Sequence, residues 1–166
     1  MEKGLDYLNA LTWGYRASRA LQVGVQFKLF TCLARKSMTC EVLAAACGAS
    51  SEPLEKLLIA CCAMGLLEKD GDVYRNSELA NRYLIEGGHL YQGHIIAHAA
   101  NVWDYWGDLA NVIVGKPGYG GPMPDHKNFI LGMQDITRGG RGQLFLDTID
   151  LTGRKKLFDV GGGPGT

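Results

Sequence analysis

Helical periodicity dominates the first part of the chain. Apolar residues recur at helical spacing from about Leu5 to Ala34 with no proline among them, which predicts one long helix. Aromatic side chains at Tyr7, Trp13 and Phe27 lie outside the main apolar stripe, so this helix is apolar on more than one side. A helix of that kind has to be covered, and a second subunit is one way to cover it.

Residues 39–84 have a shorter, strongly punctuated rhythm. The pattern predicts helices over 39–47 and 50–64, each with Ser or Thr at its start and a glycine directly after its end. A β-hairpin follows over 66–75 and turns at an Asp-Gly-Asp sequence, before a short helix over 77–84. Two helices followed by a hairpin are typical of a winged helix-turn-helix.

Many winged helices bind DNA, but the charges of this one argue against that function. The helix over 51–64 would be the recognition helix, and its charged residues are Glu52, Glu55 and Lys56. The whole chain balances 17 basic against 17 acidic residues, so no excess of positive charge is available for phosphates. We therefore expect no nucleic-acid partner and interpret the segment as a structural or dimerisation module.

A second helical region follows. Residues 89–114 predict another long helix, and 115–124 predict a loop, because four glycines and three prolines in ten residues exclude regular structure. Helical spacing resumes from Phe129 to about Asp147 and is weakened at Gly139 and Gly140. A turn over 150–153 then leads into a short apolar strand.

Side chains with metal or redox chemistry are few. His94 and His98 stand four residues apart, a spacing found in metal sites, but no third ligand is evident, so we expect packing or hydrogen bonding and no metal. His126 lies in the loop region and is interpreted as a surface residue. Five cysteines, odd in number and without a CxxC pair, favour reduced, buried thiols over a redox or metal role: Cys32, Cys40, Cys47, Cys61 and Cys62.

The most informative segment is the end of the chain, where the apolar run Leu157 to Val160 is followed at once by glycines. This pattern predicts a buried parallel strand that turns into a ligand-binding loop. A dinucleotide fingerprint would need glycine at position 166, which is Thr166, and Pro164 removes a backbone donor for a pyrophosphate. Asp159 would attract the ammonium of a methionine moiety. These details favour S-adenosylmethionine over a nicotinamide or flavin.

These features, in this order, resemble the small-molecule O-methyltransferases typified by the acetylserotonin and plant caffeate enzymes. The resemblance covers nearly the whole chain. Besides the aromatic first helix and the winged helix, it is carried by Met64-Gly65-Leu66-Leu67-Glu68, Trp106-x-x-Leu109, Gly115, Phe129-x-x-x-Met133, Asp150-Leu151 and Phe158-Asp159-Val160-Gly161-Gly162-Gly163.

The resemblance implies a mainly α-helical fold class. A helical, winged-helix dimerisation domain would occupy 1–115, and a linker loop and helix would occupy 116–153. Residues 154–166 would be the first strand and loop of a truncated Rossmann-like α/β methyltransferase domain that binds S-adenosylmethionine. The general base and the ribose-binding acid of such enzymes would lie beyond Thr166, so no catalytic residue is assigned in this chain.

The resemblance also implies where ligands would bind. The methionine part of the cofactor would lie against the glycine loop and beside Asp159, and the helical domain would help to wall a small-molecule substrate. Candidate cofactor residues are Asp159, Gly161, Gly162, Gly163 and Met133, and candidate substrate residues are Trp106 and Phe129. For Trp106, Phe129 and Met133, plain core packing is the alternative.

The leading interpretation is therefore the N-terminal portion of an S-adenosylmethionine-dependent O-methyltransferase. It would act on a small aromatic or phenolic hydroxyl compound, form a homodimer through its N-terminal helices, and be inactive by itself because it lacks a base. The alternatives are a winged-helix regulatory module without catalysis and a nicotinamide or flavin oxidoreductase. No apolar run approaches the ~20 residues of a membrane span and no signal peptide is evident, so we expect no membrane partner and a cytoplasmic location.

Overall fold

The computed structural model describes residues 4–121 and 125–162. They form two compact units, an N-terminal unit up to Gly88 and a C-terminal unit from His89. Helices account for most of the described chain, and a small sheet lies in the N-terminal unit, which confirms the predicted, mainly helical fold class. Across the described ranges, none of the helices is both long and apolar enough to cross a membrane.

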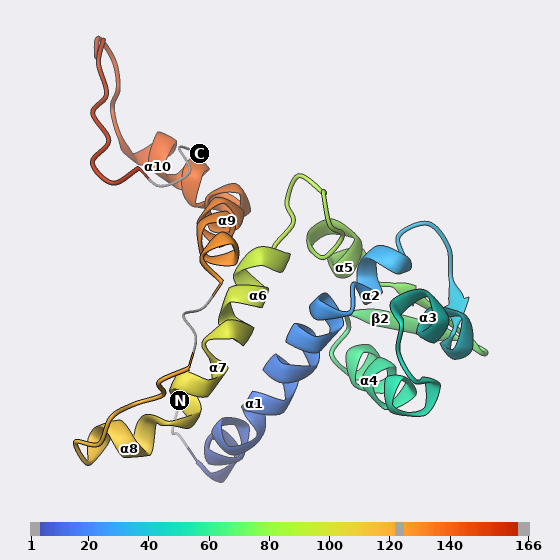
Figure 1. Cartoon of the computed structure of the whole chain (residues 1–166). Helices are drawn as coiled ribbons and strands as arrows, with labels where there is room; N and C mark the ends of the chain where they lie inside the picture. The colour runs from blue at the N-terminus through green and yellow to red at the C-terminus, as the bar shows by residue number, and fades with distance from the viewer. Residues whose placement is uncertain (1–3, 122–124, 163–166) are drawn as a thin grey trace. The chain divides into compact units, whose positions relative to one another are not determined.

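Helix α1, Leu5–Gln26, opens the N-terminal unit and differs between its two halves (Figure 1). Every residue from 5 to 19 is exposed, whereas Gln22, Gly24 and Val25 are buried. The helix begins without a side-chain cap at Gly4. The first half of α1 is therefore a bare helix, and the second half is part of the core.

The prediction of one helix as far as Ala34 is wrong in its second part. Lys28 adopts left-handed backbone angles (φ 53°), and a separate short helix follows, α2, Leu29–Cys32. The cause is packing, because α2 turns back and brings the Phe30 ring against α1. A Cβ at Gly24 would lie 3.1 Å from that ring, so only glycine allows this approach without a shift.

The predicted winged helix is confirmed. The antiparallel sheet has the order β1-β3-β2 and pairs Leu67 with Asn76 at one end of the hairpin. The predicted cap at Thr39 forms, and Ser77 caps the short helix that it begins, because each hydroxyl accepts a hydrogen bond from a backbone N–H three residues later. Ser50 precedes α4 without a side-chain cap. The elements are β1 Met38–Thr39, α3 Cys40–Cys47, α4 Ser51–Ala63, β2 Leu67–Asp70, β3 Val73–Asn76 and α5 Glu78–Tyr83.

A continuous apolar core joins these elements. One buried polar group supports it: the Asn76 side-chain amide donates to the Phe30 carbonyl at 2.8 Å and to the Asn81 side chain at 3.1 Å, tying β3 to α2. The side chains that are least exposed are Leu29, Phe30, Leu43, Leu58, Cys61, Leu67, Tyr74 and Ala80.

The C-terminal unit contains shorter helices than the sequence predicts. The expected helix over 89–114 is divided into α6 Gly93–Asn101, α7 Trp103–Gly107 and α8 Leu109–Ile113. The break before α8 falls at Gly107 and Asp108. Glycine lowers helix propensity, and the Asp108 carboxylate accepts a hydrogen bond from the Asn111 side chain.

Helical structure resumes with α9, His126–Ile136, and after a kinked segment, Thr137–Arg141, continues into α10, Gly142–Thr148. The predicted weakness at Gly139 and Gly140 is confirmed by the φ of 130° at Gly140, which no other residue type adopts readily. The predicted turn over 150–153 is also present, with the Thr152 N–H donating to the Asp150 carboxylate at 2.9 Å.

The strand predicted over 157–160 is not formed. Leu157, Phe158 and Val160 are 77%, 91% and 82% exposed, and the backbone from 154 to 159 has no regular structure. A strand is stable only when a neighbouring strand pairs with its backbone, and within the described residues no strand pairs with this one. The segment has the apolar pattern of a buried strand, but the described residues provide no second strand to pair with it.

Candidate functional site

The exposed half of α1 borders a groove in the N-terminal unit. This groove, of about 660 Å³, lies between α1 and the start of α4. Its apolar lining comes from Ala20, Val23 and Phe27 on one side and from Pro53, Leu54 and Leu57 on the other. An apolar groove beside a bare helix is a surface suited to a partner.

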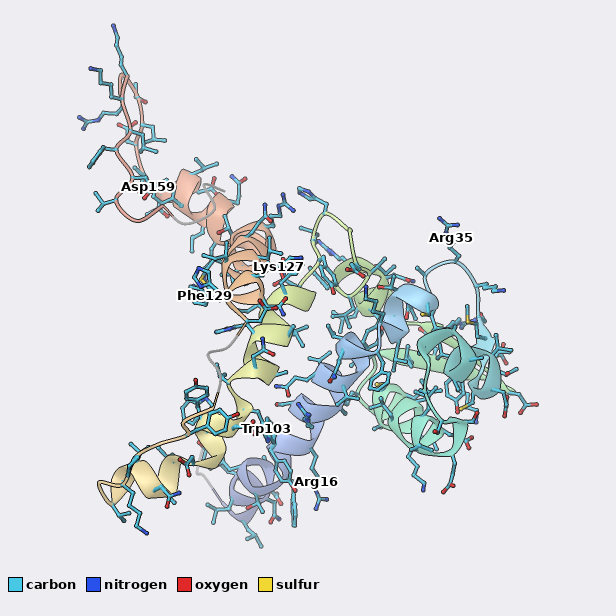
Figure 2. The ribbon with its side chains drawn as sticks, viewed as in Figure 1. Arg16, Arg35, Trp103, Lys127, Phe129 and Asp159 are labelled. Atoms are coloured by element: carbon cyan, nitrogen blue, oxygen red, sulfur yellow. The ribbon has the colours of Figure 1, made fainter. Side chains whose placement is uncertain are left out.

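Two arginines give this groove a positive border. Arg16 and Arg19 are part of its lining, and the Arg16 guanidinium lies 4.1 Å from the centre of the Trp13 ring on the same helix (Figure 2). Arg19 donates a 3.3 Å hydrogen bond to the Gln22 side chain. The exposed half of α1 carries one acid, Asp6, in its first turn. An acid near one end and arginines further along favour an antiparallel arrangement with a second α1.

In the C-terminal unit, Asp135 of α9 holds the start of α6. Asp135 as a residue is 4% exposed, and its carboxylate accepts from the backbone N–H groups of His94 at 2.9 Å and Ile95 at 3.2 Å. The other carboxylate oxygen lies 3.1 Å from Nδ1 of the His94 ring. An acid at a helix N-terminus satisfies donors that would otherwise be unpaired and matches the helix dipole.

The two helices also approach closely. A Cβ built on Gly132 would lie 3.1 Å from the Cα of Ile95, so α6 and α9 meet at a glycine. The Gln92 side chain donates to the carbonyl of Asp135 at 2.8 Å, just before α6 begins. Together with the Asp135 carboxylate, these contacts fix the position of α9, which carries two of the candidate site residues.

The structure brings Phe129 and Met133 onto one helix, one turn apart on α9. The Phe129 ring meets His98 edge-on at 5.1 Å between centroids and stacks with His126 at 6.0 Å. Met133 is half-buried, and Phe129 is 38% exposed. The predicted surface position of His126 is confirmed, since it is exposed.

Trp106, the other candidate substrate residue, lies on α7 and is 71% exposed. The His94 ring contacts Asp135, whereas Nδ1 of His98 is buried without a hydrogen-bond partner in the described part of the chain. The described residues contain no group of three or more potential metal ligands.

The glycine loop is only partly described. Gly161 has a φ of 78°, in the region that favours glycine, and a Cβ on Gly162 would overlap the Asp159 carboxylate. Asp159 is exposed on the segment after α10 (Figure 2). Gly163 lies outside the described residues. The backbone conformation at 161 favours glycine, whereas at 162 a Cβ would only displace the exposed Asp159 side chain.

Comparison with known proteins shows which family this chain is similar to. The model of the O-methyltransferase dimerisation domain matches residues 9–86, which contain most of α1 and the whole winged helix. The chain matches the N-terminal part of the small-molecule O-methyltransferases. The groove therefore lies within the segment that matches the O-methyltransferase dimerisation domain.

Individual O-methyltransferases show how far the similarity extends. The tetracenomycin polyketide synthesis 8-O-methyl transferase TcmO of Streptomyces glaucescens is 32% identical over 93% of this chain and 49% of its own length. The acetylserotonin O-methyltransferase of Macaca mulatta is 28% identical over 99% of this chain and 54% of its own. The chain spans about half the length of the curated relatives it matches.

A solved O-methyltransferase shares the fold. The crystal structure of human N-acetylserotonin methyltransferase in complex with SAM matches 90% of this chain and 50% of that chain, with a TM-score of 0.77 and 23% sequence identity. That structural match covers most of this chain. The resemblance seen in the sequence, to the N-terminal portion of the small-molecule O-methyltransferases, is confirmed.

Asp135 is the residue that the sequence interpretation missed. Its signal is an acid between Met133 and Ile136 on an otherwise apolar stretch of helix, because a buried carboxylate needs partners. The N-terminus of α6 supplies them. Asp135 positions Phe129 and Met133 through α9 and is not itself placed against a ligand.

Proposed function

We propose that this chain provides the dimerisation domain and part of the substrate wall of an S-adenosylmethionine-dependent small-molecule O-methyltransferase. The observation that carries the proposal is the O-methyltransferase dimerisation domain over residues 9–86, combined with a first helix whose apolar side chains are exposed. Relatives with an O-methyltransferase name match over most of this chain, which supports the same activity class.

The first element of the proposal is a homodimer in which a second copy covers the first half of α1. Apolar surface exposed in this way is stabilised by burial, at roughly 25 cal/mol per Å². Partner side chains from α1 would fill the groove between α1 and α4, and Asp6 of one copy would approach Arg16 and Arg19 of the other. The exposed side chains are Leu5 at 72%, Leu8 at 58%, Leu11 at 62%, Trp13 at 52% and Tyr15 at 53%.

Light scattering on two matched variants tests this dimer. The intact chain is expected to have about twice its own mass of 18.0 kDa. The double variant Leu8→Glu/Leu11→Glu places charges on the face to be covered and is expected to be monomeric. The control Ile59→Glu, on α4 at 55% exposure and outside the groove, is expected to stay dimeric. A monomeric wild type, or equal masses for both variants, contradicts the proposal.

The second element concerns the ligands. We propose that Asp159 and the loop residues Gly161, Gly162 and Gly163 lie against the methionine part of S-adenosylmethionine, with Met133 on the same side, and that Trp106 and Phe129 face a small aromatic hydroxyl substrate. The glycine conformation at 161 and the Asp159–Gly162 approach support the loop assignment. The proposed domains remain 1–115 for dimerisation, 116–153 for the linker, and 154–166 for the start of the cofactor domain.

The third element is that the chain does not catalyse methyl transfer by itself. The described residues offer no base placed beside the glycine loop, and Leu157 to Val160 lack a sheet around them. We expect no methylated product when the purified chain is incubated with labelled S-adenosylmethionine and a panel of phenols. Product formed by the chain alone contradicts this element and leaves the dimer untouched.

The charges on the winged helix support the expectation that nucleic acid is not a partner. Lys56 forms an ion pair with Glu52 at 2.9 Å, so the cation of the would-be recognition helix is already neutralised. Glu55 lies 4.0 Å from Lys69 of the hairpin. A helix with this charge pattern would repel phosphates more than it attracts them.

A further inference from the structure

Two thiols, those of Cys32 and Cys47, face each other in the N-terminal unit. Cys32 ends α2 and Cys47 ends α3, fifteen residues later, and their sulfur atoms are 3.6 Å apart. Both cysteines are half-buried and free. Both also line a cavity of about 340 Å³, together with Gln26, Phe27, Lys28 and Ala46. A small solute that enters this cavity reaches both sulfurs.

The two thiols have different surroundings. The Cys47 thiol donates a hydrogen bond to the Cys32 sulfur, and burial, together with that neighbour, raises the pKa of Cys47 to about 12. Cys32 receives the bond and lies one helical turn after Lys28, whose carbonyl accepts from the Cys32 N–H at 2.9 Å. The Lys28 ammonium forms an ion pair with the Glu86 carboxylate at 2.8 Å. We therefore expect the Cys32 sulfur, which accepts this hydrogen bond, to react first, while the Cys47 thiol keeps its proton until the second step.

We propose that Cys32 and Cys47 form a redox-convertible dithiol, in which a hydroperoxide oxidises Cys32 and Cys47 then closes a disulfide between α2 and α3. The first step forms a sulfur–oxygen bond on Cys32, breaks the peroxide oxygen–oxygen bond and releases one water or alcohol. In the second step the Cys47 sulfur attacks the Cys32 sulfur, the sulfur–oxygen bond breaks, and water leaves with the Cys47 proton. Two thiols lose two hydrogens, and one hydroperoxide is reduced.

The other three cysteines have different environments. Cys61 is fully buried, and that burial raises its pKa to about 11. The Cys40 thiol donates to the Ser51 carbonyl at 3.3 Å, and burial raises its pKa as well. Cys62 is half-buried beside Cys61 in the sequence. None of these thiols combines a facing sulfur with a shared cavity, so the reaction is selective for the pair.

Peptide mapping of the full chain after treatment with hydrogen peroxide tests the proposal. Trypsin places Cys32 in peptide 29–35 and both Cys40 and Cys47 in peptide 37–56, so fragment ions between 40 and 47 identify the partner. We expect a crosslink from Cys32 to Cys47 within one chain and a loss of two hydrogens from the intact mass. The matched control Cys62→Ser is expected to form the same crosslink.

Two further variants test the order of events. Cys47→Ser is expected to leave Cys32 as a sulfenic acid that dimedone traps, whereas Cys32→Ser is expected to react at least about tenfold more slowly with peroxide, with no adduct at Cys47. Circular dichroism of each variant checks that the chain is folded. A crosslink through Cys40, Cys61 or Cys62, crosslinks between chains only, or equal trapping in both variants would overturn the proposal.

Discussion

The two units of this chain bury their side chains very differently. In the N-terminal unit a closed apolar core joins α2, α3, α4 and the hairpin, and Leu29, Leu43 and Leu58 are fully buried. In the described part of the C-terminal unit, the buried residues are Gly93, Gly132 and Asp135. One unit is stabilised by apolar side chains, and the other by a helix contact and a capping carboxylate.

This difference shows which parts of the chain carry their own stability. A domain core normally supplies most of the free energy of folding, and only the N-terminal unit has one. The C-terminal unit exposes Trp106, Ile113 and Leu144 at 71%, 75% and 66%. In the enzyme that we propose, such side chains are covered by substrate, by cofactor-domain residues or by a second copy.

The largest expected effect comes from removing a core side chain of the N-terminal unit. Leu58→Ala leaves a cavity beneath α4 and is expected to lower the free energy of unfolding by about 3 kcal/mol. The same truncation at Leu144, exposed on α10, is expected to cost less than about 0.5 kcal/mol. Urea unfolding followed by circular dichroism measures both. Equal losses would mean that the two units do not differ as described.

A smaller effect is expected from the capping acid of the C-terminal unit. Asp135→Ala removes the acceptor for the His94 and Ile95 N–H groups and is expected to destabilise the α6–α9 contact by about 2 kcal/mol. Asp135→Asn keeps one acceptor oxygen and is expected to cost about half as much. Hydrogen exchange of the α6 amides reads out the change. The control Asp147→Ala, which removes an exposed acid, should leave α6 unaffected, and faster exchange there would argue against a specific cap.

The smallest expected effect on stability comes from replacing either of two helical glycines, Gly132 and Gly14, with alanine. Gly132→Ala pushes a methyl group against Ile95 and is expected to destabilise by about 1 kcal/mol, the overpacking cost exceeding the gain in helix propensity. Gly14→Ala on α1 meets nothing within 4 Å and is expected to stabilise by about 0.5–1 kcal/mol. Thermal unfolding of both variants checks the signs, and a stabilising Gly132→Ala would show that α6 and α9 pack less closely than described.

The sequence is informative wherever local chemistry decides the structure. The winged helix was predicted correctly from Thr39, Ser77 and the Asp-Gly-Asp turn, because caps and turns depend on neighbouring residues alone. The break of the first helix at Lys28 could not be read from periodicity, since it depends on how Phe30 packs against Gly24. The prediction of a strand over 157–160 was wrong for a related reason: a strand depends on pairing with a second strand, which the local pattern does not contain.

The candidate site was predictable to a similar extent. The glycine loop and Asp159 followed from spacing and charge, and their roles toward a cofactor stay predictions. For His94 the sequence predicted packing or a hydrogen bond, and the ring contacts the Asp135 carboxylate, but the spacing could not identify that partner. Contacts between residues 40 positions apart, such as that of Asp135 with Ile95, leave no periodic signal in the sequence. The facing thiols of Cys32 and Cys47 belong to the same class of long-range contact.

Hydrogen exchange of α1 as a function of protein concentration tests whether a second copy covers the first half of this helix. If a second copy covers the bare half of α1, the amides of residues 5–19 become more protected as concentration rises, while those of the core residues Leu29, Phe30 and Leu33 do not change. If residues 5–19 exchange at the same rate at all concentrations while the mass doubles, the chains associate through another surface, and the account of α1 as the dimerisation helix is contradicted.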